Sequence, residues 1–446
     1  MYVFKNGLGF CFEQNNALFH CIMIITLFLL ILKDINPDVL FSYDIIMLIG
    51  IIGKANVGKS TFFNAATELT VQAANYPFTT INSNIGVAYA RQKCVCTEFG
   101  IQDNPTHSIC INGNRFIPIN LIDIAGLVPG AHEGKGLGNK FLDDARQADA
   151  LIHVVDASGS TDSGGKPITP GTGDPVSDVI FVEEEFDMWL ASVVIRDWNK
   201  VSRGAESQAQ KLEQMFAKRL SGLAIKAHHI ADALYETGLY DKKATLWTRE
   251  DVFNFCKIVR LKSKPIVLAA NKADLPTVDK NIEAIKKTGR DLIICASEAE
   301  ILLRRAAKKG IIHYLPGDNS FNIKGRAELN DKQKKALDII SNIISKYGST
   351  GVQQVINHVC FKLLNLIVVY PVEDEFKLVD KKGNILPDAR LLPLGSTAKD
   401  LAYAIHADLV EGLLYAIDAR TKQRLSSEYK LKNNDIIKIV SARSRG

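Results

Sequence analysis

One glycine-rich stretch constrains the fold of this chain more than any other: GKANVGKST at residues 53–61. An apolar run at 47–52, typical of a buried parallel strand, precedes it, and a helical pattern at 62–69 follows. A strand, a GxxxxGKS segment and a helix in this order are typical of a P-loop, where backbone N–H groups and the helix N-terminus face a polyphosphate. We therefore expect nucleotide contacts from Gly53, Asn56, Val57, Gly58, Lys59, Ser60 and Thr61.

Three side chains have distinct expected roles around the phosphates. Lys59 reaches the β- and γ-phosphates, and the Ser60 hydroxyl can ligate Mg²⁺. Thr80 lies in a polar, proline-bearing stretch suited to a mobile loop, and we expect it to close over the γ-phosphate and add its hydroxyl to Mg²⁺. Thr79 is an alternative for this role, and a plain turn with solvent-facing threonines is another.

A second apolar strand, predicted at 119–124, ends in a DxxG pattern. Asp123, beside the P-loop, can hold Mg²⁺ through a water, and the Gly126 N–H can contact the γ-phosphate. Leu127 stands where many GTPases place the glutamine that orients the attacking water. Hydrolysis must then use another group, such as His132, a bound cation or a partner, and we expect slow intrinsic turnover.

The pattern NKxD follows a predicted strand at 265–271. A carboxylate at Asp274 accepts from the N1–H and the exocyclic amino group of guanine, whereas adenine offers no such pair of donors. Asn271 completes the motif, and Lys272 can pack its stem along the base. This arrangement predicts GTP rather than ATP as the ligand.

The strand predicted at 291–295 precedes Ala296 and Ser297. This position normally carries Ser-Ala, whose backbone meets the guanine carbonyl, and here the order is inverted. We expect the backbone contact to survive at Ser297, with altered side-chain support of the loop.

Alternating strands and helices predict an α/β fold, with a mostly parallel sheet and helices on both sides. Apolar residues at helical spacing predict an inserted helical hairpin whose stripe is core. Short strands, including 367–370, 376–379 and 436–440 around a helix at 397–405, predict a small α+β roll. The expected units are an N-terminal extension at 1–46, a P-loop domain at 47–178 and 261–310 with an exposed loop at 158–178, the insert at 179–260, a helical connector at 311–366 and the roll at 367–443.

The first 46 residues contain an apolar stretch from Ala17 to Leu32, near the length of a signal h-region and short for a membrane span. We prefer the interpretation that the native chain starts at Met47, with a real membrane anchor as the alternative. Phosphate chemistry of this type needs cytosolic nucleotide and Mg²⁺, which predicts a cytoplasmic protein without a membrane partner. A net charge of only +5 gives no argument for DNA as a partner.

Eight scattered cysteines suit a reducing cytosol better than a disulfide framework. Cys94, Cys96 and Cys110, with His107, could form a zinc site. A CxC pair followed by a cysteine after thirteen residues is not a standard zinc knuckle, however. We therefore expect reduced cysteines at a hairpin and no zinc.

Four ordered motifs resemble those of the Obg-related translation-factor GTPases, closest to the archaeal branch near YchF. They are GKANVGKST, NYPFTT, the stretch DIAGLVPGAHEGKGLGNKFLDDAR that begins at Asp123, and NKAD. The segment LPLGSTAKDLAYAIHADL at 392–409 is similar to a TGS domain, a ubiquitin-like β-grasp module. The resemblance covers about residues 47–443 and implies a P-loop GTPase with this domain at its C-terminus.

The resemblance also implies cofactors and partners. Asn56 matches the P-loop asparagine that in such families ligates a K⁺ ion bridging the phosphates, and such an ion supplies charge stabilisation. YchF proteins carry a glutamate-bearing variant of the base motif and tolerate ATP; because this chain has Asp274, we expect guanine preference. Association with the ribosome or ribosomal RNA is implied. The alternatives are an ATP-hydrolysing regulator of metabolism or stress and a nucleotide-sensing scaffold without significant turnover.

Overall fold

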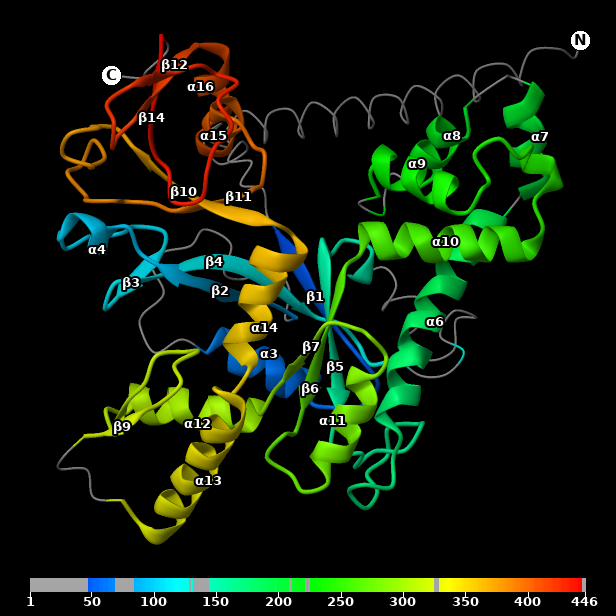
Figure 1. Ribbon diagram of the computed structural model, residues 1–446, viewed down its shortest axis with the longest axis horizontal. Coiled ribbons are helices and arrows are strands. Elements are labelled where there is room, and N and C mark those ends of the chain that lie inside the picture. The colour runs from blue at the N-terminus through cyan, green and yellow to red at the C-terminus, as the bar shows by residue number, and fades with distance from the viewer. Residues whose placement is uncertain are drawn as a thin grey trace, which may run out of the picture.

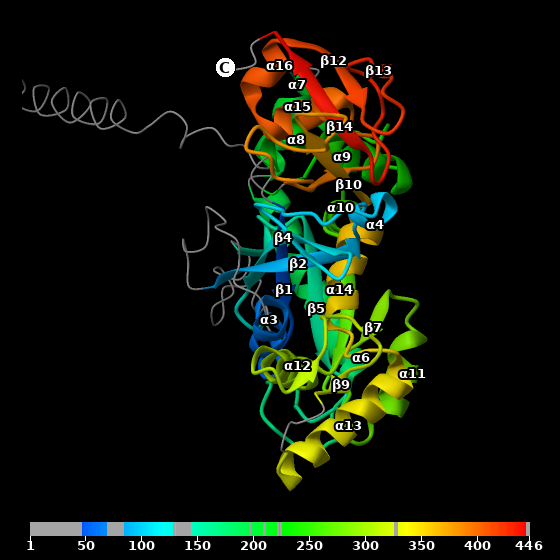
Figure 2. The ribbon, with the colours of Figure 1, turned by 90° about the vertical axis from the view of Figure 1, so that its left-hand side faces the viewer.

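The computed structural model describes residues 47–68, 84–127, 130, 144–196, 198–207, 211–220, 223, 225–324 and 329–442. Figure 1 shows a central α/β layer, a helical region at its upper right and a C-terminal domain at its upper left. Figure 2 shows the C-terminal domain above the sheet and α13 below it. The expectations for Thr80, His132 and residues 1–46 fall outside the described residues. Among the described helices, none combines the length and apolar character that crossing a bilayer requires.

The central sheet has the strand order β2-β4-β1-β5-β6-β7, and β3 pairs with β4. Neighbouring strands from β4 to β7 run parallel, whereas β2 and β3 run antiparallel to β4. This mostly parallel sheet confirms the predicted fold class. The strand bounds are β1 (Leu48–Ile52), β2 (Ile85–Lys93), β3 (Ile109–Ile111), β4 (Asn114–Asp123), β5 (Ala150–Asp156), β6 (Ile266–Asn271) and β7 (Leu292–Ile294).

Helices cover both faces of the sheet. On one face, Ile51 belongs to a buried cluster with side chains from α3 (Lys59–Thr67) and α14 (Val352–His358). Ile52, the next residue, points to the other face and packs with side chains of α6 (Pro175–Ile195). Successive side chains of a strand alternate between faces, so a nearly continuous apolar run is required when helices cover both.

The helical region continues from α6. Asp174 caps this helix by accepting from two backbone N–H groups, and Pro175 occupies its first turn, so the helix begins inside the stretch predicted as a loop. The two predicted helices correspond to α6 and α8, and the structure adds further short and long helices around them. The bounds are α7 (Trp198–Ser207), α8 (Leu212–Arg219), α9 (Ala227–Glu236), η3 (Ala244–Leu246) and α10 (Arg249–Ser263).

The predicted apolar stripe is core. Leu190, Val194, Phe216 and Leu220 are buried in one cluster with side chains of α9 and α10. Phe216 also stacks at 5.6 Å between ring centroids on Trp247. Burial of such aromatic pairs gives the region its own core.

A buried ion-pair network fastens this region to the sheet domain. The Arg260 guanidinium on α10 lies on Asp187 of α6, with 2.5 Å between Nε and Oδ1, and both side chains are almost completely buried. Glu183, one turn earlier on α6, pairs with Arg290 just before β7, at 2.7 Å. The first pair joins α10 to α6, and the second joins α6 to the segment before β7 at the edge of the sheet.

A helical connector follows β7. It contains α12, α13 and α14, and α13 is the longest of the three. The remaining bounds of this part are α11 (Val278–Lys286), α12 (Ser297–Lys308), β8 (Ile312–His313), β9 (Asn322–Ile323), α13 (Asp331–Tyr347) and the π-helical turn η4 (Val359–Leu363).

The C-terminal domain is a five-stranded sheet in the order β11-β10-β14-β12-β13, with helices on one side. The strand predicted at 376–379 is wrong. Asp374 accepts hydrogen bonds from the backbone N–H groups of Phe376 and Lys377 and bends the chain there into a turn. The bounds are β10 (Leu366–Val372), β11 (Arg390–Pro393), α15 (Ala398–Ile405), α16 (Ala407–Glu411), β12 (Leu413–Asp418), β13 (Arg424–Leu425) and β14 (Ile436–Ser441).

We expect Asp187→Ala to destabilise the helical region by about 3 kcal/mol, because it leaves the Arg260 guanidinium buried without its closest carboxylate. Tryptophan fluorescence during urea unfolding measures this change, since the three tryptophans, Trp189, Trp198 and Trp247, all lie in this region.

Glu283→Gln is the matched control, because Glu283 pairs with Lys286 on the exposed face of α11 and its loss should leave the transition in place. An unchanged transition for Asp187→Ala would show that the buried pair contributes nothing.

Candidate nucleotide-binding site

The P-loop adopts a backbone that glycine alone accommodates at two positions. Gly53 and Gly58 have φ angles of 145° and 98°. A Cβ on Gly53 would lie 2.4 Å from the Val154 carbonyl oxygen, and one on Gly58 the same distance from Asn271 Nδ2. Helix α3 begins directly after Gly58, and its first amides have no partner within the helix. These amides and the positive end of the helix dipole create a site for an anion.

Lys59 lies buried within this turn. Its Nζ donates to the Lys54 carbonyl oxygen at 2.8 Å. Burial lowers the pKa of Lys59 to about 8, although the nearby Asp123 carboxylate opposes the shift. A triphosphate would supply the counter-charge that the buried ammonium group needs.

Ser60 and Asp123 form the part of the site that fits a divalent cation. The Ser60 hydroxyl donates to Asp123 Oδ2 at 2.7 Å, which brings the end of β4 to the first turn of α3. Asp123 Oδ1 is buried and has no hydrogen-bond partner in the described part of the protein. Two oxygen donors with an unsatisfied carboxylate oxygen match the preference of Mg²⁺ for oxygen ligands and bound water.

The segment after β4 presses directly on the P-loop. A Cβ on Gly126 would lie 2.9 Å from Lys59 Nζ and 3.1 Å from Ala55 Cα, so a larger residue there would displace the Lys59 ammonium group and crowd the P-loop backbone. Leu127 donates its N–H to the Gly53 carbonyl at 3.2 Å, and its side chain is buried among core residues. The side chain at the usual glutamine position is therefore a packing residue.

Asn271 bridges three segments of the site. Its Nδ2 donates to the Val57 carbonyl at 3.2 Å, and its Oδ1 accepts from the Ser297 N–H and hydroxyl at 3.2 and 2.8 Å. The Ala296 N–H donates to the Thr350 carbonyl. The expected base contact from the Ser297 backbone needs correction, because both amides of the pair have partners inside the protein. The next amide, that of Glu298, lies in the first turn of α12, where amides have no partner within the helix.

Lys272 is held in place by residues at the end of β5, which carry none of the nucleotide-binding motifs. Its Nζ lies 2.9 Å from Asp156 Oδ2 and 3.1 Å from the Ser160 hydroxyl. Burial favours the neutral acid, but hydrogen bonds from Lys272, Ser158 and Ser160 hold the pKa of Asp156 below its usual value. Asp274, two residues on, is exposed in the turn, where its carboxylate is accessible to a base.

The loop after β5, predicted as exposed, has many exposed residues between 163 and 174, and it also packs against the P-loop. Asn56 Nδ2 donates to the Gly165 carbonyl at 2.9 Å. A Cβ on Gly165 would lie 2.7 Å from Ala55, so the two backbones touch. Lys54 is buried in an ion pair with Asp178 at 2.6 Å, and sequence reasoning found neither of these two residues. The glycine, serine and proline residues of this loop predict its turns correctly, but they do not indicate that the turns contact the P-loop.

The strand register brings the motifs to one edge of the sheet. Asp123 lies opposite Ile51, the last residue but one of β1, and Asn271 lies opposite Asp156 at the end of β5. The carboxyl ends of these parallel strands lie at the edge where open α/β sheets bind ligands. The expected residues for phosphate, cation and base therefore lie together, apart from Thr80 and His132, which the structure does not describe.

Three segments of the chain match protein families. Residues 48–174 match the 50S ribosome-binding GTPase family, and residues 269–374 match the family described as Obg-like GTPase YGR210-like, G4 motif-containing domain. Residues 382–441 match the TGS domain, which agrees with the β-grasp sheet seen there.

Relatives extend this similarity over most of the chain. An uncharacterized GTP-binding protein of Methanocaldococcus jannaschii is 51% identical over 397 residues, which cover 89% of this chain and 99% of the relative. An uncharacterized GTP-binding protein of Schizosaccharomyces pombe is 38% identical over 80% of this chain and 90% of its own length. The ribosome-binding ATPase YchF of Bacillus subtilis is 32% identical over 56% of this chain and 66% of its own length.

Two solved structures resemble the fold. The GTP-binding protein of Pyrococcus horikoshii OT3 matches with a TM-score of 0.70 and 40% identity, over 89% of this chain and all of that chain. The YchF GTPase of Schizosaccharomyces pombe matches with a TM-score of 0.54 and 21% identity, over 89% and 98% of the two chains, and supports the fold alone.

The pKa of Lys59 leads to a calorimetric expectation. At pH 8 about half of the Lys59 side chains are neutral before binding, and a bound triphosphate would restore the proton, so binding should take up roughly half a proton. At pH 7 the uptake should fall to roughly a tenth. Titrations with Mg²⁺·GTP in two buffers of different ionisation enthalpy measure it.

Lys59→Arg should abolish the uptake, because arginine stays charged at both pH values. Lys264→Arg is the control, since burial also lowers the pKa of Lys264 to about 8, but its ammonium group binds the Arg146 carbonyl away from the P-loop. Equal uptake in wild type and Lys59→Arg would contradict the assignment.

Proposed function

Because the chain belongs to the Obg-like GTPases related to YchF and carries a C-terminal TGS domain, we propose that it hydrolyses GTP slowly to GDP and phosphate and acts as a nucleotide switch on the ribosome. One observation carries the proposal: Lys59, the Ser60–Asp123 pair and the turn bearing Asp274 lie along the same edge of one sheet. The proposed units are those expected from the sequence, with α6 crossing from the P-loop domain into the insert.

Guanine specificity is the part of the proposal that rests on Asp274. The exposed carboxylate can accept two hydrogen bonds from guanine, and adenine would leave it facing an acceptor. Lys272, fixed by Asp156, supports one face of the base, and the Glu298 amide is the proposed donor to the guanine carbonyl. ATP remains the competing substrate, because the YchF of Bacillus subtilis is named an ATPase.

Mg²⁺ would be held by Ser60 and Asp123, with Thr80 as the proposed further ligand. When bound, it neutralises charge on the β- and γ-phosphate oxygens. The carbonyl of Gly165 holds the amide nitrogen of Asn56, which leaves the amide oxygen for the proposed K⁺ ion. Lys59 and the P-loop amides position the phosphates, and this chain supplies no glutamine at position 127.

A contact after Gly126 suggests how the switch reaches the helical region. The Gly130 N–H donates to Glu185 Oε1 at 2.7 Å, and Glu185 is buried on α6. The same helix continues into the helical region. If the loop after Gly126 changes its conformation when the γ-phosphate is present or absent, this hydrogen bond would transmit the change to α6. We propose this route, with His132 in the same loop as a group that could position the attacking water.

The ribosome is the proposed partner because of the names of related proteins. Residues 48–174 match a family named for binding the 50S ribosome, and the Bacillus subtilis relative is named a ribosome-binding ATPase. Cosedimentation with ribosomes in the presence of GTP, GDP or neither tests this part, and binding that does not depend on the nucleotide would argue against a switch.

We expect Asp274→Asn to weaken GTP binding roughly a hundredfold, because the charged acceptor for two guanine donors is lost. The same variant should gain affinity for xanthosine triphosphate, whose C2 carbonyl accepts from the new amide group. Equilibrium binding of GTP, ATP and xanthosine triphosphate measures both changes.

Asp279→Asn provides the control, because Asp279 is an exposed aspartate five residues later whose carboxylate pairs with Lys346. If wild type binds ATP as tightly as GTP, or Asp274→Asn leaves GTP affinity unchanged, the guanine assignment is wrong.

The role of Asn56 gives an expectation for turnover. GTP hydrolysis should be at least about tenfold faster in K⁺ than in Na⁺, because the ion would add charge stabilisation at the phosphates. Asn56→Gly, which tolerates the φ of 61° at this position, should remove the stimulation, and Asn56→Asp should retain it. Phosphate release by single turnover, with and without ribosomes, measures the rates for GTP and ATP.

No phosphate release under any of these conditions would favour a nucleotide-sensing scaffold. Turnover that is equal in K⁺ and Na⁺ would remove Asn56 from the proposed site while leaving the GTPase proposal in place.

A further inference from the structure

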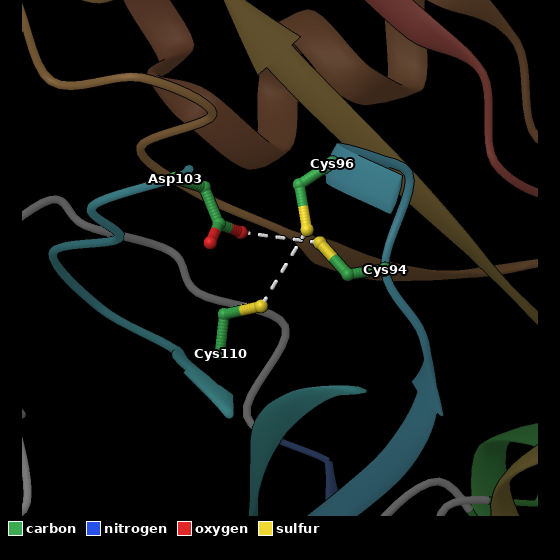
Figure 3. Close-up of side chains that lie close together, drawn as sticks. All are labelled: Cys94, Cys96, Asp103 and Cys110. Carbon is green, nitrogen blue, oxygen red and sulfur yellow. Dashed lines mark hydrogen bonds between the residues drawn. The ribbon is translucent and has the colours of Figure 1, made fainter. Parts of the chain in front are cut away.

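Three thiols and a carboxylate converge at the far end of the β2–β4 hairpin. Cys94 follows β2, Cys96 opens the short helix α4 (Cys96–Phe99), Asp103 lies in the next loop and Cys110 is on β3. One ligand atom from each lies within 4.8 Å of all the others. Figure 3 shows the four side chains pointing toward a common centre.

The separations of these atoms fit a tetrahedral metal site. A zinc ion with Zn–S bonds of about 2.3 Å requires its sulfur ligands to lie about 3.8 Å apart, and a sulfur and a carboxylate oxygen about 3.5 Å apart. Cys96 Sγ and Cys110 Sγ are 3.8 Å apart, and Cys94 Sγ and Asp103 Oδ2 are 3.2 Å apart. These two separations lie close to those that a shared zinc ion would require.

The surroundings of the cluster suit bound anionic ligands. The Arg115 guanidinium is completely buried, and its Nη2 donates to Asp103 Oδ2 at 2.8 Å while its Nε donates to Cys94 Sγ at 3.4 Å. Such outer hydrogen bonds orient metal ligands and offset the excess negative charge of three thiolates and a carboxylate around a divalent ion. Ser108 and the Leu386 carbonyl hold the rest of the guanidinium in place.

We propose that Cys94, Cys96, Asp103 and Cys110 bind one zinc ion as a closed structural site. This proposal departs from the expectation drawn from spacing, which favoured reduced cysteines without zinc. The alternative zinc site considered there included His107, whereas the proposed fourth ligand is Asp103, which no cysteine spacing would have indicated. Four protein ligands leave no open position for catalysis, which is typical of structural zinc.

The proposed ion would fix the surface on which the TGS domain docks. Val95 and the two neighbouring cysteines pack with Val368, Tyr370 and Leu386 of that domain in one buried cluster. The loop inside the site reaches the domain directly, since the Asn104 N–H donates to the Ile385 carbonyl at 3.1 Å and the Thr106 N–H to the Pro387 carbonyl at 2.8 Å. Zinc would therefore stabilise the junction between the two domains.

The test uses the full chain purified without chelator. We expect about one zinc ion per chain by elemental mass spectrometry, and replacement by Co²⁺ should give the intense visible absorption of a tetrahedral thiolate site. Chelator should remove the ion and increase hydrogen exchange at the Asn104 and Thr106 amides, which donate across the junction, while exchange in the P-loop stays unchanged. These measurements on the wild type do not depend on whether a variant folds.

Variants identify the ligands. Cys96→Ser, Cys110→Ser and Asp103→Asn should each lose most of the zinc, whereas Cys256→Ser and Cys360→Ser, which alter buried thiols elsewhere, should keep it. The proposal is overturned if the wild type binds no more zinc than Cys96→Ser. It is also overturned if peptide mapping of the purified chain finds a disulfide between Cys96 and Cys110, or if chelator leaves the exchange of the Asn104 and Thr106 amides unchanged.

Discussion

The side-chain amide of Asn271 joins the segments on which the candidate nucleotide site depends. It donates to the Val57 carbonyl of the P-loop and accepts both donors of Ser297 at the start of α12. The side chain is 3% exposed, so leaving one of these groups unpaired would cost about 1–3 kcal/mol. Gly58 approaches the same amide more closely than any Cβ permits. The P-loop and the base-reading turn therefore form one rigid unit.

A second buried network holds the other end of the P-loop helix. Arg304 on α12 donates to Glu300 Oε1 at 2.6 Å and to the Ala66 and Glu68 carbonyls at the C-terminus of α3. A cation at this position meets the negative end of the helix dipole. Tyr314 donates to the remaining Glu300 oxygen at 2.6 Å. Since α12 contacts α3 near its start through Asn271 and at its end through Arg304, the connector sets the position of the phosphate-binding helix.

The sequence predicted what local patterns determine and missed what tertiary contacts determine. A strand, a glycine turn and a helix are local, so the P-loop and its place at the strand edge could be foreseen. Asp103 in the cysteine cluster could not, because it acts through neighbours that only the folded chain supplies. The turn at Asp374 is different, since its carboxylate accepts from residues two and three positions further on, and this local signal was missed because the apolar residues nearby favoured a strand. The Ser297 amide looked available from its place in the motif, but the side chain of Asn271 occupies it. The motif residues were recognisable, whereas their partners were not.

The two ends of strand β4 serve different purposes. Asp123 closes the strand at the nucleotide edge, and Asn114 opens it beside the cysteine cluster, roughly 30 Å away along the strand. The TGS domain packs at the second end, so its docking has no direct contact with the Ser60–Asp123 pair. The helical region, in contrast, is linked to the loop after Gly126 through Glu185 on α6. In the proposed switch, the nucleotide state therefore acts first on the helical region, and the TGS domain provides a fixed second surface for a partner.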